Sequence, residues 1–446
     1  MLQALIDLPL RHRALVLVGL LAVIGWGIHT MFRLPIEAFP DLTNNQVVVI
    51  TECRGMAPQE VEQLVSFPIE TALMGIPRTQ SIRSVSKLGL SMVTLVLDDE
   101  VPTYFARQLV NERLQEVRSR VPAGLEPSLG PVATAFGEVY QYTIGGGGLS
   151  PREIKTLHEW TIKNQLRTVR GVSEVNTWGG ETAQVEIRID PAKLRAYDLT
   201  LREVYERIRE NNNNFSAGFI EHASEQYTVL GLGRARQAPD LANIVLRASH
   251  GTPLMLKDVA EVGEGALLRQ GATLRDGRGE TVSGMVIMLK GENGRDVIAR
   301  AKERIASLTL PKGVRLLPFY DQSTVIDGTL ATVRKNLLEA GVLVIAVLLL
   351  ALGNFRAALI VAFAIPVSML TGFIGMAFFG VTVNLMSLGA VDFGMIVDGA
   401  VVMVEHTVSR LHRDPEDSNF NPSERIRQAA LEVGRPITFA VGIIHH

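Results

Sequence analysis

The chain has little of what would crosslink it or suit it to nucleic acid. Its 446 residues include one cysteine, Cys53, so no disulfide can form within the chain and no cysteine cluster suggests a structural zinc site. Lys and Arg number 44 against 46 Asp and Glu, and no basic stripe is interleaved with the aromatic residues, which make up only 6%. The composition therefore argues against a nucleic-acid partner, and packing must hold the fold together.

Apolar residues are plentiful instead, at 47%, beside 20% charged residues. This balance is too apolar for an ordinary soluble enzyme and too polar for a chain embedded in a membrane throughout. Apolar runs of about 20 residues can cross a bilayer core. We expect spans at 14–32, 337–352, 357–379 and 385–408, with the start of a truncated fifth span at 436–446.

The first apolar run follows the basic residues RHR at 11–13. A cleaved signal peptide also begins with basic residues, but this run is long, and RLPIEAFPD after it lacks a small-x-small cleavage site. We therefore expect a retained membrane anchor.

Basic residues in short loops favour the cytoplasmic side of a membrane. The expected short segments carry several arginines, and all of these segments fall on one side: Arg11, Arg13, Arg356, Arg410, Arg413, Arg425 and Arg427. Arg334 and Lys335 on the other side dilute this signal. The pattern predicts a cytoplasmic N-terminus at 1–13, a cytoplasmic connector at 409–435 and a large domain outside the inner membrane.

The region between the first two spans alternates between strand-like and helix-like periodicity. NQVVVITEC, a helical run, two strands and a second helix give the order strand-helix-strand-strand-helix, and a second pass begins near Glu138. In that pass we assign TAQVEIRID (182–190) and TLREVYERIRENN to the unit itself. The order predicts two split βαβ units of the ferredoxin-like kind, at 33–135 and 136–335, the second with an insertion at about 213–275. A generic α+β domain is the alternative.

Isolated residues of this region give no metal or catalytic site. His158, His222 and His250 are scattered, and lone histidines are more often surface or packing residues than metal ligands. Cys53 follows a Val-rich strand and is expected to be a small buried residue. No nucleophile-base pair or metal-ligand spacing emerges, so we do not expect an enzyme.

The fourth span contains AVDFGMIVDGAVVMVEH, which places Asp392, Asp398 and Glu405 in an apolar stretch. Each ionised carboxylate there costs about 2.5 to 3.5 kcal/mol unless it faces protein or water. At about 100° per residue, Asp398 and Glu405 share a helix face and Asp392 lies on another. Glu405 is near the expected cytoplasmic end, where pairing with Arg410 would explain it. Asp398 lies mid-span with no basic residue inside any span, which favours reversible protonation, because desolvation favours the neutral form of a carboxyl group.

These features together resemble the first half of a resistance-nodulation-division (RND) efflux pump. The resemblance covers nearly the whole chain: the anchor, the two external units, and the motifs AIPVSMLTGF, DFGMIVDGAVVMVE and EVGRPITFA. The DFG, DGA and VE set is similar to the heavy-metal branch of the cobalt-zinc-cadmium type, whereas drug exporters usually carry two adjacent Asp. Here Asp398 is followed by Gly399. His406 departs from the pattern, which ordinarily continues VEN.

The resemblance implies an α+β membrane protein, with transmembrane helices and a periplasmic porter region of ferredoxin-like subdomains that carries an inserted docking subdomain. It implies proton translocation by Asp398, assisted by Asp392 and Glu405, and antiport of a heavy-metal cation, most simply a divalent one (zinc, cobalt, cadmium or nickel). It also implies a homotrimer in the bacterial inner membrane, a periplasmic adaptor, an outer-membrane channel and no cofactor.

Three questions stay open at this point: the nature of the chain end, the function and the ligands of the cation. Relatives in the family are about twice as long, so the chain ending in VGIIHH is expected to be a truncation, a frameshift or a tagged piece that does not transport alone. A drug or organic-solute exporter, and a membrane-anchored assembly module, are the competing functions. Thioethers of Met386, Met395 and Met403 could serve a soft cation, but Met in a membrane helix is more often packing material.

Overall fold

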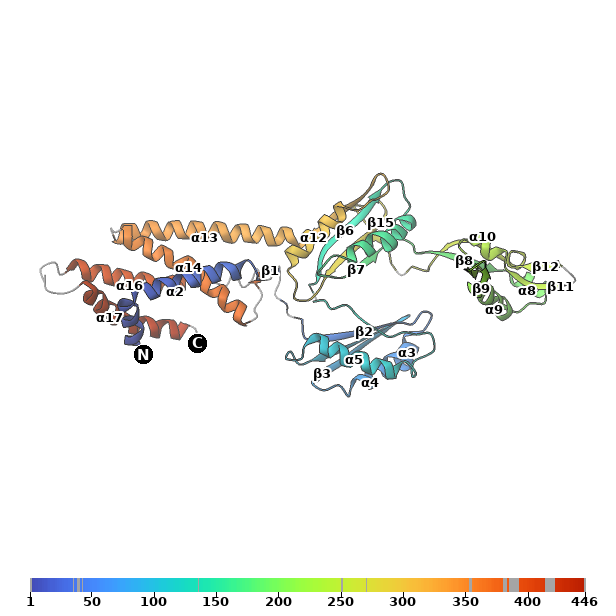
Figure 1. Cartoon of the computed structure of the whole chain (residues 1–446), viewed down its shortest axis with the longest axis horizontal. Coiled ribbons are helices and arrows are strands. Elements are labelled where there is room, and N and C mark those ends of the chain that lie inside the picture. The colour runs from blue at the N-terminus through green and yellow to red at the C-terminus, as the bar shows by residue number, and fades with distance from the viewer. Residues whose placement is uncertain are drawn as a thin grey trace.

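The molecule has a helical end and an end made of three α/β units (Figure 1). This computed structural model describes residues 2–34, 36–37, 41, 43–134, 136–249, 252–269, 271–352, 355–379, 383–384, 393–413 and 422–444. The chain leaves the helical end after its second helix and returns through one long helix, α13, so both ends of the described chain lie in the helical part.

The described part of the helical end consists of one short helix and several long ones. They are α1 (Leu2–Arg11), α2 (Arg13–Met31), α13 (Gln322–Leu352), α14 (Phe355–Phe379), α16 (Phe393–Arg413) and α17 (Pro422–Ile444). Among the residues described, α2 and α14 are long and apolar enough to cross a bilayer. Exposed side chains such as Leu17, Trp26 and Phe363 give these two helices apolar outer surfaces. Large exposed apolar surfaces are typical of sites that contact a membrane or another protein. The expected spans 14–32 and 357–379 coincide with these helices, and the others stay predictions.

A close contact joins α2 to α14. A Cβ atom added to Gly27 of α2 would stand 2.6 Å from the Cβ of Leu370 on α14. Small residues permit this approach of two helix backbones in membrane proteins. Gly27 therefore sets how closely α2 packs on α14.

The first α/β unit is a four-stranded antiparallel sheet covered by helices. Its elements are β2 (Gln46–Glu52), α3 (Pro58–Val61), the π-helical turn η1 (Glu62–Ser66), α4 (Phe67–Leu73), β3 (Thr79–Lys87), β4 (Leu90–Leu97), α5 (Thr103–Val117) and β5 (Ser128–Leu129). The sheet order is β3-β4-β2-β5. Buried residues recur every four positions on the helices, as at Ala106, Val110 and Leu114 of α5. The predicted strand-helix-strand-strand-helix order is confirmed.

The second unit repeats this topology. Its elements are β6 (Glu138–Gly146), α6 (Pro151–Leu157), η2 (His158–Ile162), α7 (Lys163–Arg167), β7 (Val172–Trp178), β14 (Thr273–Leu274), β15 (Glu280–Met288), α12 (Gly294–Ala306) and β16 (Val314–Asp321). β6 pairs with β15 and β16, and β7 pairs with the other edge of β15. In both units the first strand therefore lies between the third and the fourth, the arrangement of a split βαβ unit.

The insertion forms a separate unit at the far end of the molecule (Figure 1). It contains β8 (Ala183–Ile189), α8 (Pro191–Ala196), α9 (Leu201–Asn211), β9 (Phe215–His222), β10 (Glu225–Gly231), α10 (Ala238–Ala242), β11 (Val245–Ser249), β12 (Thr252–Met255), α11 (Leu256–Val259) and β13 (Ala260–Ala266). β8 pairs antiparallel with β13 along its whole length. Leu194, Val204 and Leu256 share a core of their own.

The predicted place of β8 and α9 in the second unit is therefore wrong. The separately packed unit runs from β8 to β13, so it begins about thirty residues before the expected insertion at 213–275. An alternating apolar pattern identifies a strand but does not say which strand it pairs with. The wider subdomain bounds, 33–135 and 136–335, stay predictions.

Two short segments meet between the helical end and the first unit. β1 (Ile36–Glu37), just after α2, pairs in parallel with β17 (Val383–Asn384), just after α14. Segments about 350 residues apart in sequence are thus joined at the base of the α/β units.

Candidate functional site

The acid-bearing segment predicted from sequence maps mainly to α16. Asp392 lies outside the described residues, and for Asp398 the structure gives the helical backbone. Glu405 is on the same helix and is exposed. Because α16 is continuous from Phe393 to Arg413, positions 398 and 405 lie within about 20° of each other around its axis.

Two neighbouring helices cover two different faces of α16. Val401 and Val404 pack with Ala358 and Val361 of α14 in a small apolar cluster. On another face, a Cβ atom at Gly399 would stand 3.2 Å from Cγ2 of Ile437 on α17. Gly399 therefore allows α17 to approach the helix where a larger side chain would have to displace it.

A cluster of three polar side chains joins α16 to α17 near the connector, and we call it the Glu432 cluster. His406 Nε2 lies 2.8 Å from Oε2 of Glu432. Arg410 donates to the other oxygen, Oε1, of the same carboxylate. The hydrogen bonds from His406 and Arg410 lower the pKa of Glu432. One carboxylate on α17 thus receives two donors from successive turns of α16.

Further polar contacts bring the N-terminal segment to the start of α17. Arg427 pairs with both Asp7 of α1 and Glu424, and the hydrogen bond from Arg427 lowers the pKa of Asp7. Arg13 Nη2 donates to Oγ of Ser423 over 2.7 Å. The basic residues around α1 and the start of α17 therefore lie at one end of the helical bundle. Their location on the cytoplasmic side of a membrane stays a prediction.

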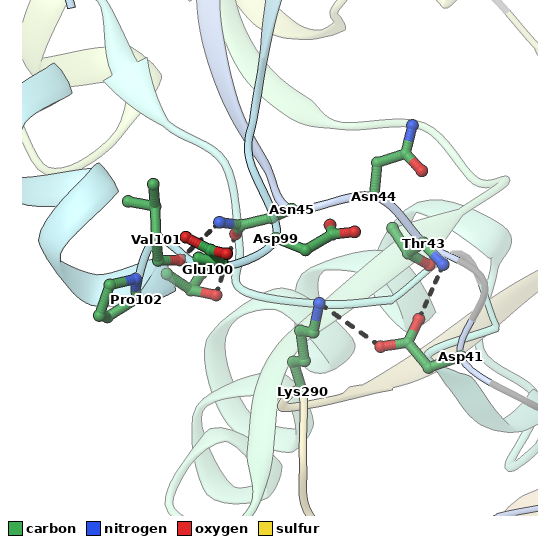
Figure 2. A pocket seen from close by; sticks show the side chains of 10 residues that line it. Asp41, Thr43, Asn44, Asn45, Asp99, Glu100, Val101, Pro102 and Lys290 are labelled. Atoms are coloured by element: carbon green, nitrogen blue, oxygen red, sulfur yellow. Dashed lines mark hydrogen bonds and ion pairs between the residues drawn. The ribbon is translucent and has the colours of Figure 1, made fainter. Parts of the chain in front are cut away.

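A polar pocket lies between the first unit and the loop after β15 (Figure 2). It has a volume of about 540 Å³. Lys290 Nζ of the second unit lies 3.5 Å from a carboxylate oxygen of Asp41, which belongs to the segment that leads into β2. Asp99 and Glu100 also line the pocket. The pocket carries more acidic than basic side chains, and the Asp41–Lys290 pair links the two units across it.

The buried Asn45 lines this pocket, and its side-chain amide is hydrogen-bonded to neighbouring residues. Its Nδ2 donates to the carbonyl oxygens of Val101 and Asp98, over 2.6 and 3.1 Å. Its Oδ1 accepts from Thr103 over 3.2 Å. Asn45 therefore fixes the turn before α5, which carries Asp99 and Glu100.

The isolated histidines and the cysteine noted in the sequence lie in different surroundings. Cys53 and His158 are fully buried, and His222 is exposed on β9, whereas His250 lies outside the described residues. No group of three or more His, Cys, Asp or Glu side chains suited to a metal ion occurs in the described part of the chain. Burial of Cys53 is as the sequence predicted.

Comparison with known proteins places these features in a family. The sequence model described as the AcrB/AcrD/AcrF family matches residues 5–445. The chain belongs to this RND family. It is 44% identical to protein HelA of Legionella pneumophila, and 42% identical to the cobalt-zinc-cadmium resistance protein CzcA of Cupriavidus metallidurans.

Each of these alignments covers the whole chain and 43% of the relative. A crystal structure of a heavy metal efflux pump superposes with a TM-score of 0.85 at 37% identity, over 98% of this chain and 43% of that one. The chain therefore spans a little under half the length of these RND proteins, and the predicted resemblance to the heavy-metal branch is confirmed.

Sequence reasoning did not find Glu432 or the Asp41–Lys290 pair. Glu432 stands in EVGRPITFA, which was noted for its resemblance alone, and its partners lie 26 and 22 residues earlier. No local spacing rule connects residues on two helices separated by a connector. The polar character of Glu432 beside an apolar run was the one available signal.

Proposed function

We propose that the chain is the N-terminal half of a proton-driven exporter of heavy-metal cations in the bacterial inner membrane. The observation that carries this proposal is the match of the whole chain to heavy-metal efflux proteins, at up to 44% identity. On this proposal the helical end crosses the membrane and the α/β units lie in the periplasm.

The cation is divalent on this proposal. Relatives at 42% and 36% identity are named for resistance to cobalt, zinc and cadmium and to nickel and cobalt. Thiolate ligands for a soft monovalent cation are limited to Cys53, which is buried in the first unit.

Proton coupling is assigned to Asp398, with Asp392 and Glu405 assisting. A carboxyl group in the span takes up a proton from one side and releases it to the other, and its two charge states favour different packings of the surrounding helices. The support is the position of 398 and 405 on one flank of α16, beside the faces covered by α14 and α17.

The working transporter on this proposal is a homotrimer that meets a periplasmic adaptor and an outer-membrane channel. On this proposal the chain alone does not transport, because it covers only 43% of each of these relatives. The missing half would complete the substrate cleft and supply a basic residue to the acids of α16.

A resistance assay tests the proposal. The chain, followed by the C-terminal half of the Cupriavidus metallidurans relative, is expressed in bacteria that lack their own heavy-metal exporters. We expect growth in zinc, cobalt or cadmium that Asp398→Asn abolishes, while Asp276→Asn on an exposed turn leaves it intact.

Other outcomes of that assay favour the competing functions. Resistance to dyes or organic solutes without resistance to metals would establish the organic-solute exporter. Adaptor binding by the chain alone, independent of metal and of Asp398, would favour an assembly module.

A further inference from the structure

Two faces of α16 contact neighbouring helices through different kinds of side chain. The Val401 and Val404 face packs on the apolar side chains of Ala358 and Val361 of α14. His406 and Arg410 lie four residues apart, on one face, and both donate to Glu432 of α17. Gly399 lies within about 20° of His406 around the axis, so the same face also carries the close approach to Ile437.

Positions 398 and 405 lie on neither of these faces. Position 398 is about 80° from position 406 around the helix, and position 405 is about 100° from it in the same direction. The flank with positions 398 and 405 therefore lies between the face on α14 and the face on α17. Glu405 is exposed on this flank. A rotation of α16 would carry both positions toward one neighbouring helix and away from the other.

We propose that Glu432 is a positioning residue that fixes the rotation of α16 and thereby holds Asp398 and Glu405 on their flank. It does so through His406 and Arg410. The proposal rests on the proposed proton coupling by Asp398, and it assigns to His406 a role as donor to Glu432.

Chemistry favours this ion pair as the element that sets the rotation. Apolar contacts between Val and Ala side chains are not directional and tolerate a small turn of the helix. Gly399 has no side chain that could interlock with α17. Two hydrogen bonds that end on the two oxygens of one carboxylate require a defined orientation of donors and acceptor.

Other charged groups also lie on the neighbouring helices. α17 also carries Glu424, which pairs with Arg427 of its own helix. α14 contributes Arg356 near its beginning. Among the described ion pairs, those between α16 and α17 all end on Glu432.

A hydrophobic carbodiimide measures the position of the acids without any transport assay. Dicyclohexylcarbodiimide reacts with protonated carboxyl groups in apolar surroundings, and mass spectrometry gives the ratio of labelled Asp398 to labelled Glu405. The chain in lipid vesicles at one fixed pH is compared with Glu432→Ala, Glu432→Asp and the exchanged pair Glu432→Arg with Arg410→Glu. Glu424→Ala on the same helix is the matched control.

We expect the labelling ratio to change by about threefold in Glu432→Ala, the size expected of half-exposed ion pairs. The ratio returns toward the wild-type value in Glu432→Asp and in the exchanged pair, and it is unchanged in Glu424→Ala. This rescue separates positioning from a general loss of structure. It holds even where Glu432→Ala folds poorly, because the exchanged pair keeps an attraction between the same two positions.

An unchanged ratio in Glu432→Ala overturns the positioning role and leaves the proton site standing. The same change in Glu424→Ala, or an exchanged pair that resembles Glu432→Ala, also overturns it. Absence of label on Asp398 in the wild-type chain contradicts the proton site itself, and the positioning role falls with it.

Discussion

His158 is a buried histidine with both ring nitrogens engaged. Its Nε2 lies 2.8 Å from the hydroxyl of Tyr142, and its Nδ1 lies 2.8 Å from Oγ1 of Thr177. A Cβ atom at Gly284 of β15 would stand 2.6 Å from Nε2 of His158, so this position of the strand has room only for glycine. Burial lowers the pKa of His158 from 6.5 to about 4. The imidazole is therefore neutral in the folded unit.

This burial makes the second unit sensitive to acid. Above pH 6.5 His158 is neutral in both the folded and the unfolded chain, so its full contribution to the free energy of unfolding is present. Between pH 6.5 and about 4, His158 of the unfolded chain binds a proton that the folded chain does not bind. The free energy of unfolding should therefore fall by about 3 kcal/mol over this range through His158 alone. Urea unfolding of wild type and His158→Gln at pH 7 and pH 4.5 measures it.

The variant should show the smaller loss between the two pH values, although it is less stable at pH 7. His222→Gln is the control, because His222 is exposed on β9, and it should keep the wild-type dependence. Equal pH dependence in wild type and His158→Gln would contradict the account of this residue.

Cys53 should be unreactive in the folded chain. Its side chain is fully buried in the first unit, its Sγ lies 3.4 Å from the carbonyl oxygen of Thr51, and burial raises the pKa of the thiol. Because the thiolate is the reactive form, we expect maleimide modification to be at least about 100-fold slower in buffer than in denaturant. Rapid labelling of the native chain would show that the first unit opens far more readily than its core indicates.

At the scale of elements, each of the two repeated units has a π-helical turn in its first helix. η1 ends on Ser66, which is buried and bonds to Ser86 and Ser91 of the sheet over 2.7 and 2.8 Å. η2 begins on His158, which bonds to Tyr142 and Thr177 of its own sheet. An extra residue in a helical turn re-aims the side chains around it. In both units it accompanies a buried polar contact between helix and sheet.

The passage from β16 into α13 is a second joint between elements. Asp321 ends β16 and accepts from the backbone N–H and the hydroxyl of Ser323, at the start of α13. Lys302 of α12 pairs with Asp321 and also donates to Ser323 over 3.1 Å. Three elements therefore meet on one mostly buried carboxylate, and the pairing with Lys302 helps keep the pKa of Asp321 below its usual value.

Removal of the lysine charge should loosen this joint. Lys302→Met keeps most of the apolar stem but leaves Asp321 without its cation, and we expect a loss of about 1–2 kcal/mol in the free energy of unfolding. Arg78→Met, at the exposed pair Arg78–Glu100, should cost less than about 0.5 kcal/mol. Thermal unfolding of both variants checks this, and equal costs would show that burial of Asp321 does not strengthen the pair.

Local patterns predicted the elements better than their partners. The strands and helices of the first unit follow from alternation and from four-residue spacing, both of which a sequence displays directly. β8 displays the same alternation as a strand of the main sheet, yet its partner is β13, about seventy residues later in the chain. Pairing over that distance depends on the packing of α8 and α9, which the periodicity of β8 does not contain.

In the candidate site, too, some residues can be predicted from the sequence and others only from the structure. Asp398 and Glu405 were predicted because a carboxylate in an apolar run is costly wherever the helix packs. Glu432 was not, because its significance comes from His406 and Arg410 on another helix. The cost of a single side chain can be judged from sequence, whereas the contact of two helices requires the structure.

At the scale of the whole molecule, the two α/β units connect differently to the helical end. The second unit continues without a break from β16 into α13, a helix of 31 residues (Figure 1). The first unit follows α2 through the segment that holds β1 and Asp41. Asp41 also meets Lys290 of the second unit. A movement of α13 relative to α2 would therefore act directly on the pocket between the units.

The most direct test of the account is proton release during metal export by the chain completed with the C-terminal half of its Cupriavidus metallidurans relative. Reconstituted vesicles with an acidic lumen and a trapped pH-sensitive dye are given zinc outside, so that export from the cytoplasmic side moves zinc inward. We predict a rise in lumenal pH that requires zinc and disappears in Asp398→Asn, while Asp276→Asn behaves as wild type. Zinc uptake that continues in Asp398→Asn with the same change in lumenal pH would contradict the assignment of Asp398 as the proton carrier.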